Sequence, residues 1–220
     1  MAASREDLPL GKMIPPVPLG VEIPPEPADV GARALYVASR LLAGATTFFF
    51  LAFLFAYFYL RSINQDHMWR PPHINPDQGL GAAFVACVLI SAALAILAGR
   101  RMKRRSSGWV APASVALALG LAAVALQCVE YTVQHFGPTN GAYASVFCAW
   151  SGFYLIAVLG TMYWLETQIA TELRARRAPA GHGDIRDPDR LIAPGLDACV
   201  FYWSYLAAIG AIAYVTLYLL

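Results

Sequence analysis

Long apolar stretches alternate with short polar connections along this 220-residue chain. A helix needs about 20 mainly apolar residues to cross a bilayer, and five stretches meet that length. We predict helices at Ala34–Leu60, Leu80–Gly99, Trp109–Val133, Gly141–Gln168 and Ala193–Leu220. The pattern therefore predicts an all-α membrane protein. Its expected parts are a proline-rich tail over residues 1–33 and a bundle of five transmembrane helices over residues 34–220.

The composition agrees with this class. Hydrophobic residues make up 58% of the chain and charged residues 14%, whereas soluble domains carry about 25% charged residues. Proline is frequent in the tail and disfavours helix there. Two interpretations of the tail remain open: a disordered segment, and a strap that lies along a partner subunit.

Lys and Arg residues gather in alternate connections. The tail and the connections after the second and fourth helices carry most of them, and the remaining connections carry few. Because positively charged flanks stay in the cytoplasm, we expect a cytoplasmic N-terminus and an outside C-terminus. The expected location is the cytoplasmic (inner) membrane of a bacterium. This orientation also accounts for the net charge of +2 without a nucleic-acid partner.

The side chains that most often bind haem or metals are badly placed for that role. All four histidines fall in connections between the predicted helices: His67, His73, His135 and His182. All four cysteines lie inside helices and form no CxxC motif: Cys87, Cys128, Cys148 and Cys199. Since imidazole is the commonest side-chain ligand for haem and copper, we expect no haem, no metal and no catalytic residue in this chain.

One polar face stands out in the third predicted helix. Gln127, Glu130, Tyr131 and Gln134 follow each other at helical spacing, so they share one face, which must point at protein rather than lipid. A structural polar seam is the favoured interpretation, because a proton relay would need other titratable groups at mid-membrane depth. We expect Glu130 to pair with Arg61, one of the few cations on that side.

Five sequence segments occur in an order that resembles a known family. They are FFFLAFLFAYFYLRS, MWRPP, QCVEY, GAYASVFCAWSGFY and FYWSYLAAIGAIAY. Together they resemble subunit III of haem–copper oxidases (cytochrome c oxidase subunit III) in its short, five-helix form, over residues 33–220. The resemblance implies a bundle without a redox centre that packs beside a subunit I-like catalytic chain and other subunits. Haem and copper are then expected in those partners, and structural phospholipid around this chain, in a complex of aerobic respiratory electron transport.

The resemblance also points to residues with structural, lipid-contact or partner-contact roles. They are Arg61, Trp69, Gln127, Glu130, Tyr131, Tyr154, Tyr202 and Trp203.

The chain departs from the family pattern where the family usually carries buried polar groups. A Ser-Glu pair in the first helix, two histidines in the fourth, and a histidine and an aspartate in the fifth are replaced by Ala45-Thr46, Tyr154, Ala157, Ser204 and Ala207. These departures indicate a divergent member. They leave open an accessory protein of a nitric oxide reductase or another membrane oxidoreductase complex, and an assembly factor. A transporter or channel subunit also stays open, although it would need a polar path through mid-membrane, where the second, fourth and fifth helices offer little beyond hydroxyl groups.

Overall fold

The computed structural model of the chain describes residues 28–64, 69–71, 74–104, 107–177 and 188–220. The predicted tail lies outside the described residues as far as residue 27. Over the described ranges the elements are α1 (Ala28–Ser62), α2 (Gln78–Lys103), a short 3-10 helix η3 (Ser107–Trp109), α3 (Val110–Val133), α4 (Ala142–Arg177), α5 (Pro188–Tyr214) and a terminal π-helix η4 (Val215–Leu219). Within these described ranges five helices are long and apolar enough to cross a membrane, which confirms the predicted fold class.

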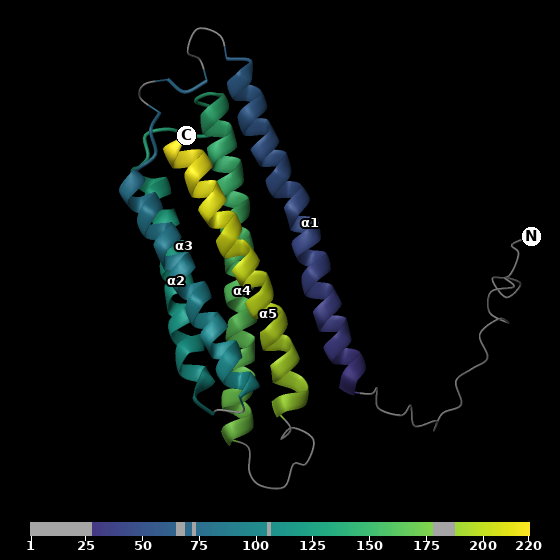
Figure 1. Cartoon of the computed structure of the whole chain (residues 1–220). Helices are drawn as coiled ribbons and strands as arrows, with labels where there is room; N and C mark the ends of the chain where they lie inside the picture. The colour runs from purple at the N-terminus through teal and green to yellow at the C-terminus, as the bar shows by residue number, and fades with distance from the viewer. Residues whose placement is uncertain (1–27, 65–68, 72–73, 105–106, 178–187) are drawn as a thin grey trace, which may run out of the picture.

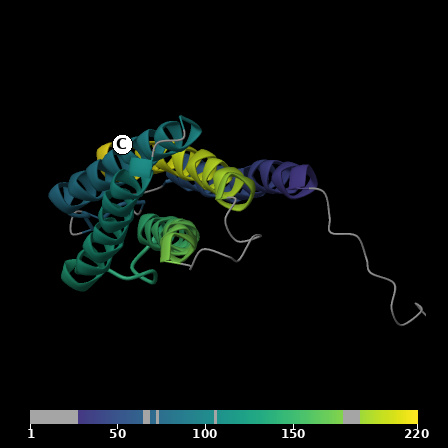
Figure 2. The same ribbon diagram turned by 90° about the horizontal axis from the view of Figure 1, so that it is seen from below.

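The five long helices run side by side in two layers. Figure 1 shows α5 in front of α4, with α1 on one side and α2 and α3 on the other. Seen from below in Figure 2, α1, α5 and α2 form one row and α4 and α3 the other. Helix α5 packs against α1, α2 and α4, and α3 packs against α2 and α4. Helix α5 is therefore the central element, and α1 is the peripheral one.

Small residues allow α2 and α3 to approach closely. Ala92 and Ala95 of α2 and Ala113 and Ala116 of α3 are all buried. Apolar side chains gain little by leaving lipid for protein, so helix association in a membrane depends on close packing of this kind. Helix α1 buries a stripe of its own at helical spacing, with Ser39, Ala43, Thr46, Phe50 and Tyr57.

Helix α4 is longer than predicted. We expected it to end near Gln168 and to be followed by a connection, but it continues to Arg177. Glu172 and Arg176 form an ion pair of 2.6 Å at i, i+4 spacing, and basic side chains in the last turn favour the negative end of the helix dipole. Hydropathy reports only the membrane-crossing part of a helix, so it missed this polar extension.

The two ends of the bundle differ in charge. We call the end with the N-terminus of α1 and the C-termini of α2 and α4 the basic end, since it carries Arg100, Arg101, Lys103, Arg104, Arg174, Arg176 and Arg177. The opposite end is called the distal end. At the basic end Lys103 of α2 pairs with Asp197 of α5 at 2.7 Å, with both side chains at least half exposed. Such an exposed pair contributes about 0–1 kcal/mol, so it marks the edge of the apolar region more than it stabilises the bundle.

Candidate functional site

The most polar buried group of the described chain surrounds Glu130 at the distal end of α3. Glu130 is 1% exposed. Its Oε2 accepts a hydrogen bond of 2.8 Å from Gln127 Nε2. The hydroxyl of Tyr218 donates to the same carboxyl group, 2.7 Å from Oε2 and 2.9 Å from Oε1. Since α3 supplies Glu130 and Gln127 and η4 supplies Tyr218, we call these three residues the distal knot.

The predicted ion pair between Glu130 and Arg61 is wrong. No cation contacts Glu130 among the described residues, and its carboxyl group bonds to Tyr218 and Gln127 instead. Arg61 is exposed in the last turn of α1, with its guanidinium 6.0 Å from the ring of Tyr57. Helix α1 packs on α4 and α5, so Arg61 lies on a different side of the bundle from Glu130.

Three contacts hold Tyr218 in position. Tyr143 of α4 donates a hydrogen bond of 2.5 Å to the carbonyl of Leu217, and Gln78 of α2 donates one of 3.3 Å to the carbonyl of Tyr218. The Tyr218 ring lies against Gly81, where any added side chain would overlap it. The distal knot and these contacts together join α2, α3 and α4 to η4, at the end of α5. Tyr218 belongs to the π-helix η4, and its phenol there lies toward Glu130.

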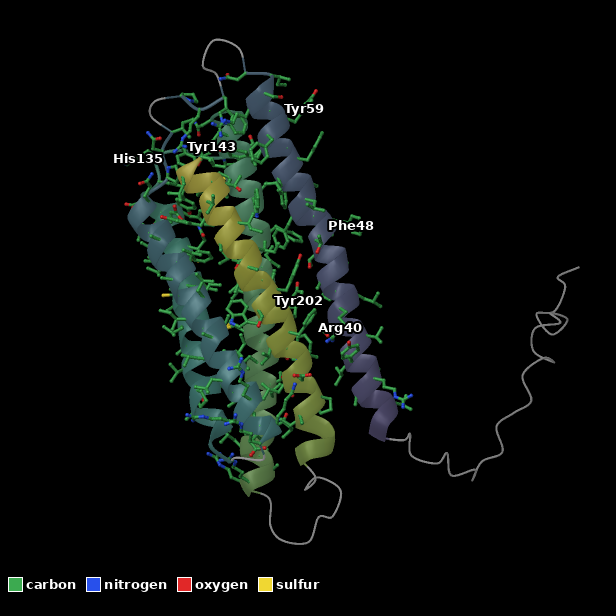
Figure 3. All side chains as sticks on the ribbon, viewed as in Figure 1. Arg40, Phe48, Tyr59, His135, Tyr143 and Tyr202 are labelled. Atoms are coloured by element: carbon green, nitrogen blue, oxygen red, sulfur yellow. The ribbon has the colours of Figure 1, made fainter. Side chains whose placement is uncertain are left out.

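An aromatic cluster lies beside the knot. The rings of Tyr57, Trp69 and Tyr143 meet edge to face, with centroids 5.1 Å and 5.8 Å apart for the two pairs that contain Trp69. Gly141, with φ of 131°, makes the turn that starts α4 and precedes Tyr143, and few residues other than glycine adopt this conformation. The predicted contact residue Trp69 is therefore held at the distal end by Tyr57 and Tyr143. Figure 3 labels Tyr143 in this region.

The polar face predicted for α3 divides between two neighbours. Gln127 and Glu130 are buried and face Tyr218, whereas Tyr131 is half-buried and donates a hydrogen bond of 2.7 Å to Ser151 of α4. Ser151 in turn donates to the carbonyl of Phe147 in its own helix. This face therefore joins α3 to both η4 and α4.

Two further polar contacts lie deeper in the bundle. Trp203 of α5 donates its indole N–H to Ser91 of α2 at 3.1 Å, and Ser91 donates to the carbonyl of Ala116 in α3 at 2.6 Å. Tyr154 of α4 donates to the carbonyl of Leu206 in α5 at 2.8 Å. The predicted contact residue Tyr202 is buried, and its ring stacks on that of Tyr205 with centroids 5.9 Å apart.

The hydroxyl groups at the positions where the chain departs from the family pattern all bond to protein. Thr46 donates to the carbonyls of Leu42 and Ala43 within α1, and Ser204 donates to the carbonyl of Val200 within α5. As described above, Tyr154 bonds to a carbonyl of α5. The Thr46 and Ser204 hydroxyls therefore bond within their own helices, and the Tyr154 hydroxyl joins α4 to α5.

Residues able to bind a metal do not converge in the described part of the chain. It holds no group of three or more His, Cys, Asp or Glu side chains arranged to bind a metal ion. The four cysteines are free. Of the histidines, His135 is described and exposed, two residues after the end of α3, while His67, His73 and His182 lie outside the described residues.

Fold and site together define a class: a multi-pass helical membrane protein whose buried polar side chains join its helices. Comparison with known proteins narrows this class. The family model described as "Cytochrome c oxidase subunit III" matches residues 32–220. The chain belongs to the cytochrome c oxidase subunit III family, which confirms the resemblance seen in the sequence.

Individual relatives are distant. Cytochrome c oxidase subunit 3 of Tachyglossus aculeatus aculeatus is 25% identical over 178 residues, which cover 78% of this chain and 64% of the relative. The same subunit of Ornithorhynchus anatinus is 24% identical over the same shares. That of Branchiostoma lanceolatum is 22% identical over 200 residues, which cover 86% of this chain and 72% of the relative. The chain thus spans less than two thirds of the first two relatives.

Sequence reasoning missed three residues that build the site. Tyr218, Tyr143 and Ser91 were not among the residues predicted to have structural or contact roles. Their contacts join residues 88, 74 and 112 positions apart, so no local pattern marks them. One signal was available in the sequence. Few cations lie on the same side of the membrane as Glu130, so its carboxyl group needs a neutral hydrogen-bond donor such as a tyrosine.

Proposed function

We propose that this chain is a non-catalytic subunit III of a haem–copper terminal oxidase of aerobic respiration. In this role it packs beside a subunit I-like catalytic chain, stabilises that chain and its surrounding phospholipid, and leaves haem and copper to its partners. The family match supports the role. The distal knot and the Ser91–Trp203 contact support the non-catalytic part, because their polar groups are occupied in holding the helices together.

The proposal rests on the side chains of Thr46, Tyr154 and Ser204, which carry hydroxyl groups in place of the family's buried polar residues. A proton path through a membrane needs titratable groups in its depth, and these positions hold hydroxyls bonded to backbone carbonyls. Packing and lipid retention then remain as the contributions of this chain. Both act on the lifetime and yield of a complex rather than on its chemical step.

We also propose that the protein lies in the cytoplasmic membrane of a bacterium with its basic end in the cytoplasm. The clustering of Arg and Lys at that end supports this orientation. The basic side chains at that end are also attracted to the anionic lipids of the inner leaflet, which favours the same orientation of the protein.

Deletion of the gene tests the role. The remaining complex, purified in mild detergent and fully loaded with haem, should keep its initial turnover per catalytic centre within about twofold, a barrier change below ~0.5 kcal/mol. The yield of complex, or its activity over many turnovers, should fall. Expression of the wild-type gene from a plasmid is the control and should restore both.

Two outcomes would overturn the proposal. Loss of initial turnover in a fully assembled, haem-loaded remnant would give the chain a direct catalytic part. Failure of the purified complex to contain this chain, with the chain found only on precursors, would make it an assembly factor. Identification of the co-purified chains by mass spectrometry also separates a terminal oxidase from a nitric oxide reductase or another oxidoreductase.

A further inference from the structure

A carboxylate without a partner, that of Glu166, lies on an outward face of the membrane-crossing helix α4. The residue is exposed within the span Ala142–Arg177. No cation and no hydrogen-bond donor contacts its carboxyl group among the described residues. Ionisable side chains in membrane-crossing helices are rare and usually face a polar partner, which points to a partner outside this chain.

Glu166 lies at the depth where the apolar region begins at the basic end. An added side chain at Gly195 of α5 would overlap the side-chain amide of Gln168 on α4, so these two residues lie at one level. Glu166 and Asp197 are each two residues nearer the distal end, about 3 Å farther in. The Lys103–Asp197 ion pair, which marks the edge of the apolar region, is therefore level with Glu166.

The direction of α4 keeps the Glu166 carboxyl group away from the lipid head groups. Side chains lean toward the N-terminus of their helix, and the N-terminus of α4 is at the distal end (Figure 1). The carboxyl group of Glu166 therefore leans into the apolar region, whereas that of Asp197, on the oppositely directed α5, leans out of it. A carboxylate placed in this way is stabilised most by a cation that another chain brings.

The described part of the chain offers no cation at this position. Side chains pair along a helix with those three or four positions away. The four such positions around Glu166 are all uncharged: Met162, Tyr163, Ile169 and Ala170. On the neighbouring helix α1, Arg40 donates to the carbonyl of Tyr36 and lies over the ring of Phe201 instead. An ion pair of Glu166 would therefore join this chain to another one.

The face of α4 beside Glu166 has the shape to accept a helix. Ile156 is 70% exposed and Tyr163 is 69% exposed, and a side chain added at Gly160 between them would meet nothing within 4 Å. These three positions and Glu166 follow at three- and four-residue spacing, so they form one continuous face. The glycine leaves a dip in which the backbone of a second helix can approach closely, as membrane helices do at small residues.

We propose that this face of α4 docks a transmembrane helix of a partner subunit, which carries a Lys or Arg opposite Glu166. A helix is the expected occupant because it satisfies its own backbone polar groups in lipid, and a basic side chain complements the unpaired carboxylate. The inference rests on the proposed function, in which this chain belongs to a membrane complex, and adds the docking face and the charge of the partner helix. A phospholipid with a cationic head group is the competing occupant.

Photo-crosslinking in the intact complex identifies the occupant. A photoreactive benzoyl-phenylalanine replaces Tyr163, one turn from Glu166, and the complex is illuminated and purified in mild detergent. We expect a cross-link to a membrane-crossing segment of another chain, with a Lys or Arg within about two turns, roughly 11 Å, of the linked residue. The same analogue in place of Ile90, which is exposed on α2, is the control and should not link to that segment. Cross-links to lipid alone, or to a segment without a basic residue, would overturn the proposal.

Two substitutions test the face itself, through the ratio of the cross-linked partner chain to this chain in the purified complex. Glu166→Gln should lower this ratio at least about tenfold, because it leaves the partner's cation without its counter-charge. Gly160→Leu should lower it while the carboxylate stays in place. Arg174→Gln and Gly44→Leu are the matched controls and should keep the wild-type ratio, because Arg174 is exposed two turns nearer the basic end and Gly44 is equally open on α1.

Exchange of the two charges separates an ion pair from a general packing role. Glu166→Lys alone should lose the partner helix, and a second change of the cross-linked Lys or Arg to Glu should restore it. All variants should elute as wild type in gel filtration, because the substituted positions are exposed. Unchanged ratios in both Glu166→Gln and Gly160→Leu, or absence of rescue, would overturn the proposal. Failure of the proposed function would appear separately, as a wild-type chain that purifies with a complex other than an oxidase, where the same substitutions still test the docking face.

Discussion

Replacement of Tyr218 by phenylalanine tests whether the distal knot stabilises the bundle. Tyr218→Phe removes the hydroxyl that lies 2.7 Å and 2.9 Å from the two carboxyl oxygens of Glu130. It keeps the ring that packs edge to face on Phe147 at 5.6 Å. Removing one partner of a buried hydrogen bond leaves the other polar group without its partner, which costs about 1–3 kcal/mol. We therefore expect the free energy of unfolding to fall by about 2 kcal/mol.

The assay is equilibrium unfolding of the purified chain in mixed micelles of mild detergent and dodecyl sulfate, followed by circular dichroism. Tyr163→Phe is the matched control, because Tyr163 is 69% exposed on α4, and surface changes of this kind stay within about 0.5 kcal/mol. The double variant with Glu130→Gln gives the coupling between the two side chains, which for residues in contact is about 0.5–3 kcal/mol. Two results would refute a stabilising role of the distal knot. One is a Tyr218→Phe chain as stable as the Tyr163→Phe control; the other is a double variant whose loss of unfolding free energy equals the sum of the losses in the two single variants.

Four other outcomes are expected. Gly210→Ala should destabilise the bundle by about 1–3 kcal/mol, because its methyl group would overlap the hydroxyl of Tyr154. Gly160→Ala is the control for this change: the added methyl group meets open space, and stability in the same unfolding assay should not change. Ser91→Ala should cost about 1–3 kcal/mol, because it leaves a buried indole N–H without an acceptor, and unchanged stability would contradict that account. In intact cells a cysteine at Ser106 should resist an impermeant thiol reagent and one at Asn140 should react, and the reverse pattern would invert the proposed orientation. The chain purified alone should show no Soret band and no stoichiometric iron or copper, and either signal co-eluting with the protein in gel filtration would contradict its proposed cofactor-free role.

The helices could be predicted because their signal is local. A run of about 20 apolar residues reports a membrane-crossing helix by itself, and all five were found. The end of α4 was not found, because its last turns are charged and continue the helix beyond the apolar part. The i, i+4 spacing of Glu172 and Arg176 was the signal for that extension, together with the arginines at its end.

The candidate site was predictable only within one helix. Spacing placed Gln127 and Glu130 on one face, and burial of that face followed from its polarity in a membrane. The partner could not be predicted, because hydropathy gives the depth of a residue but not the order of helices around the bundle. Arg61 and Tyr218 both lie at distal ends of helices, and helix packing alone brings Tyr218 to Glu130.

The separation of 88 residues between Glu130 and Tyr218 has a consequence for biogenesis. At synthesis rates of about 5–20 residues per second, the phenol emerges about 4–18 s after the acid it will bind. A chain halted before α5 therefore lacks Tyr218 and keeps only Gln127, from the same helix, as the donor of the distal knot to Glu130.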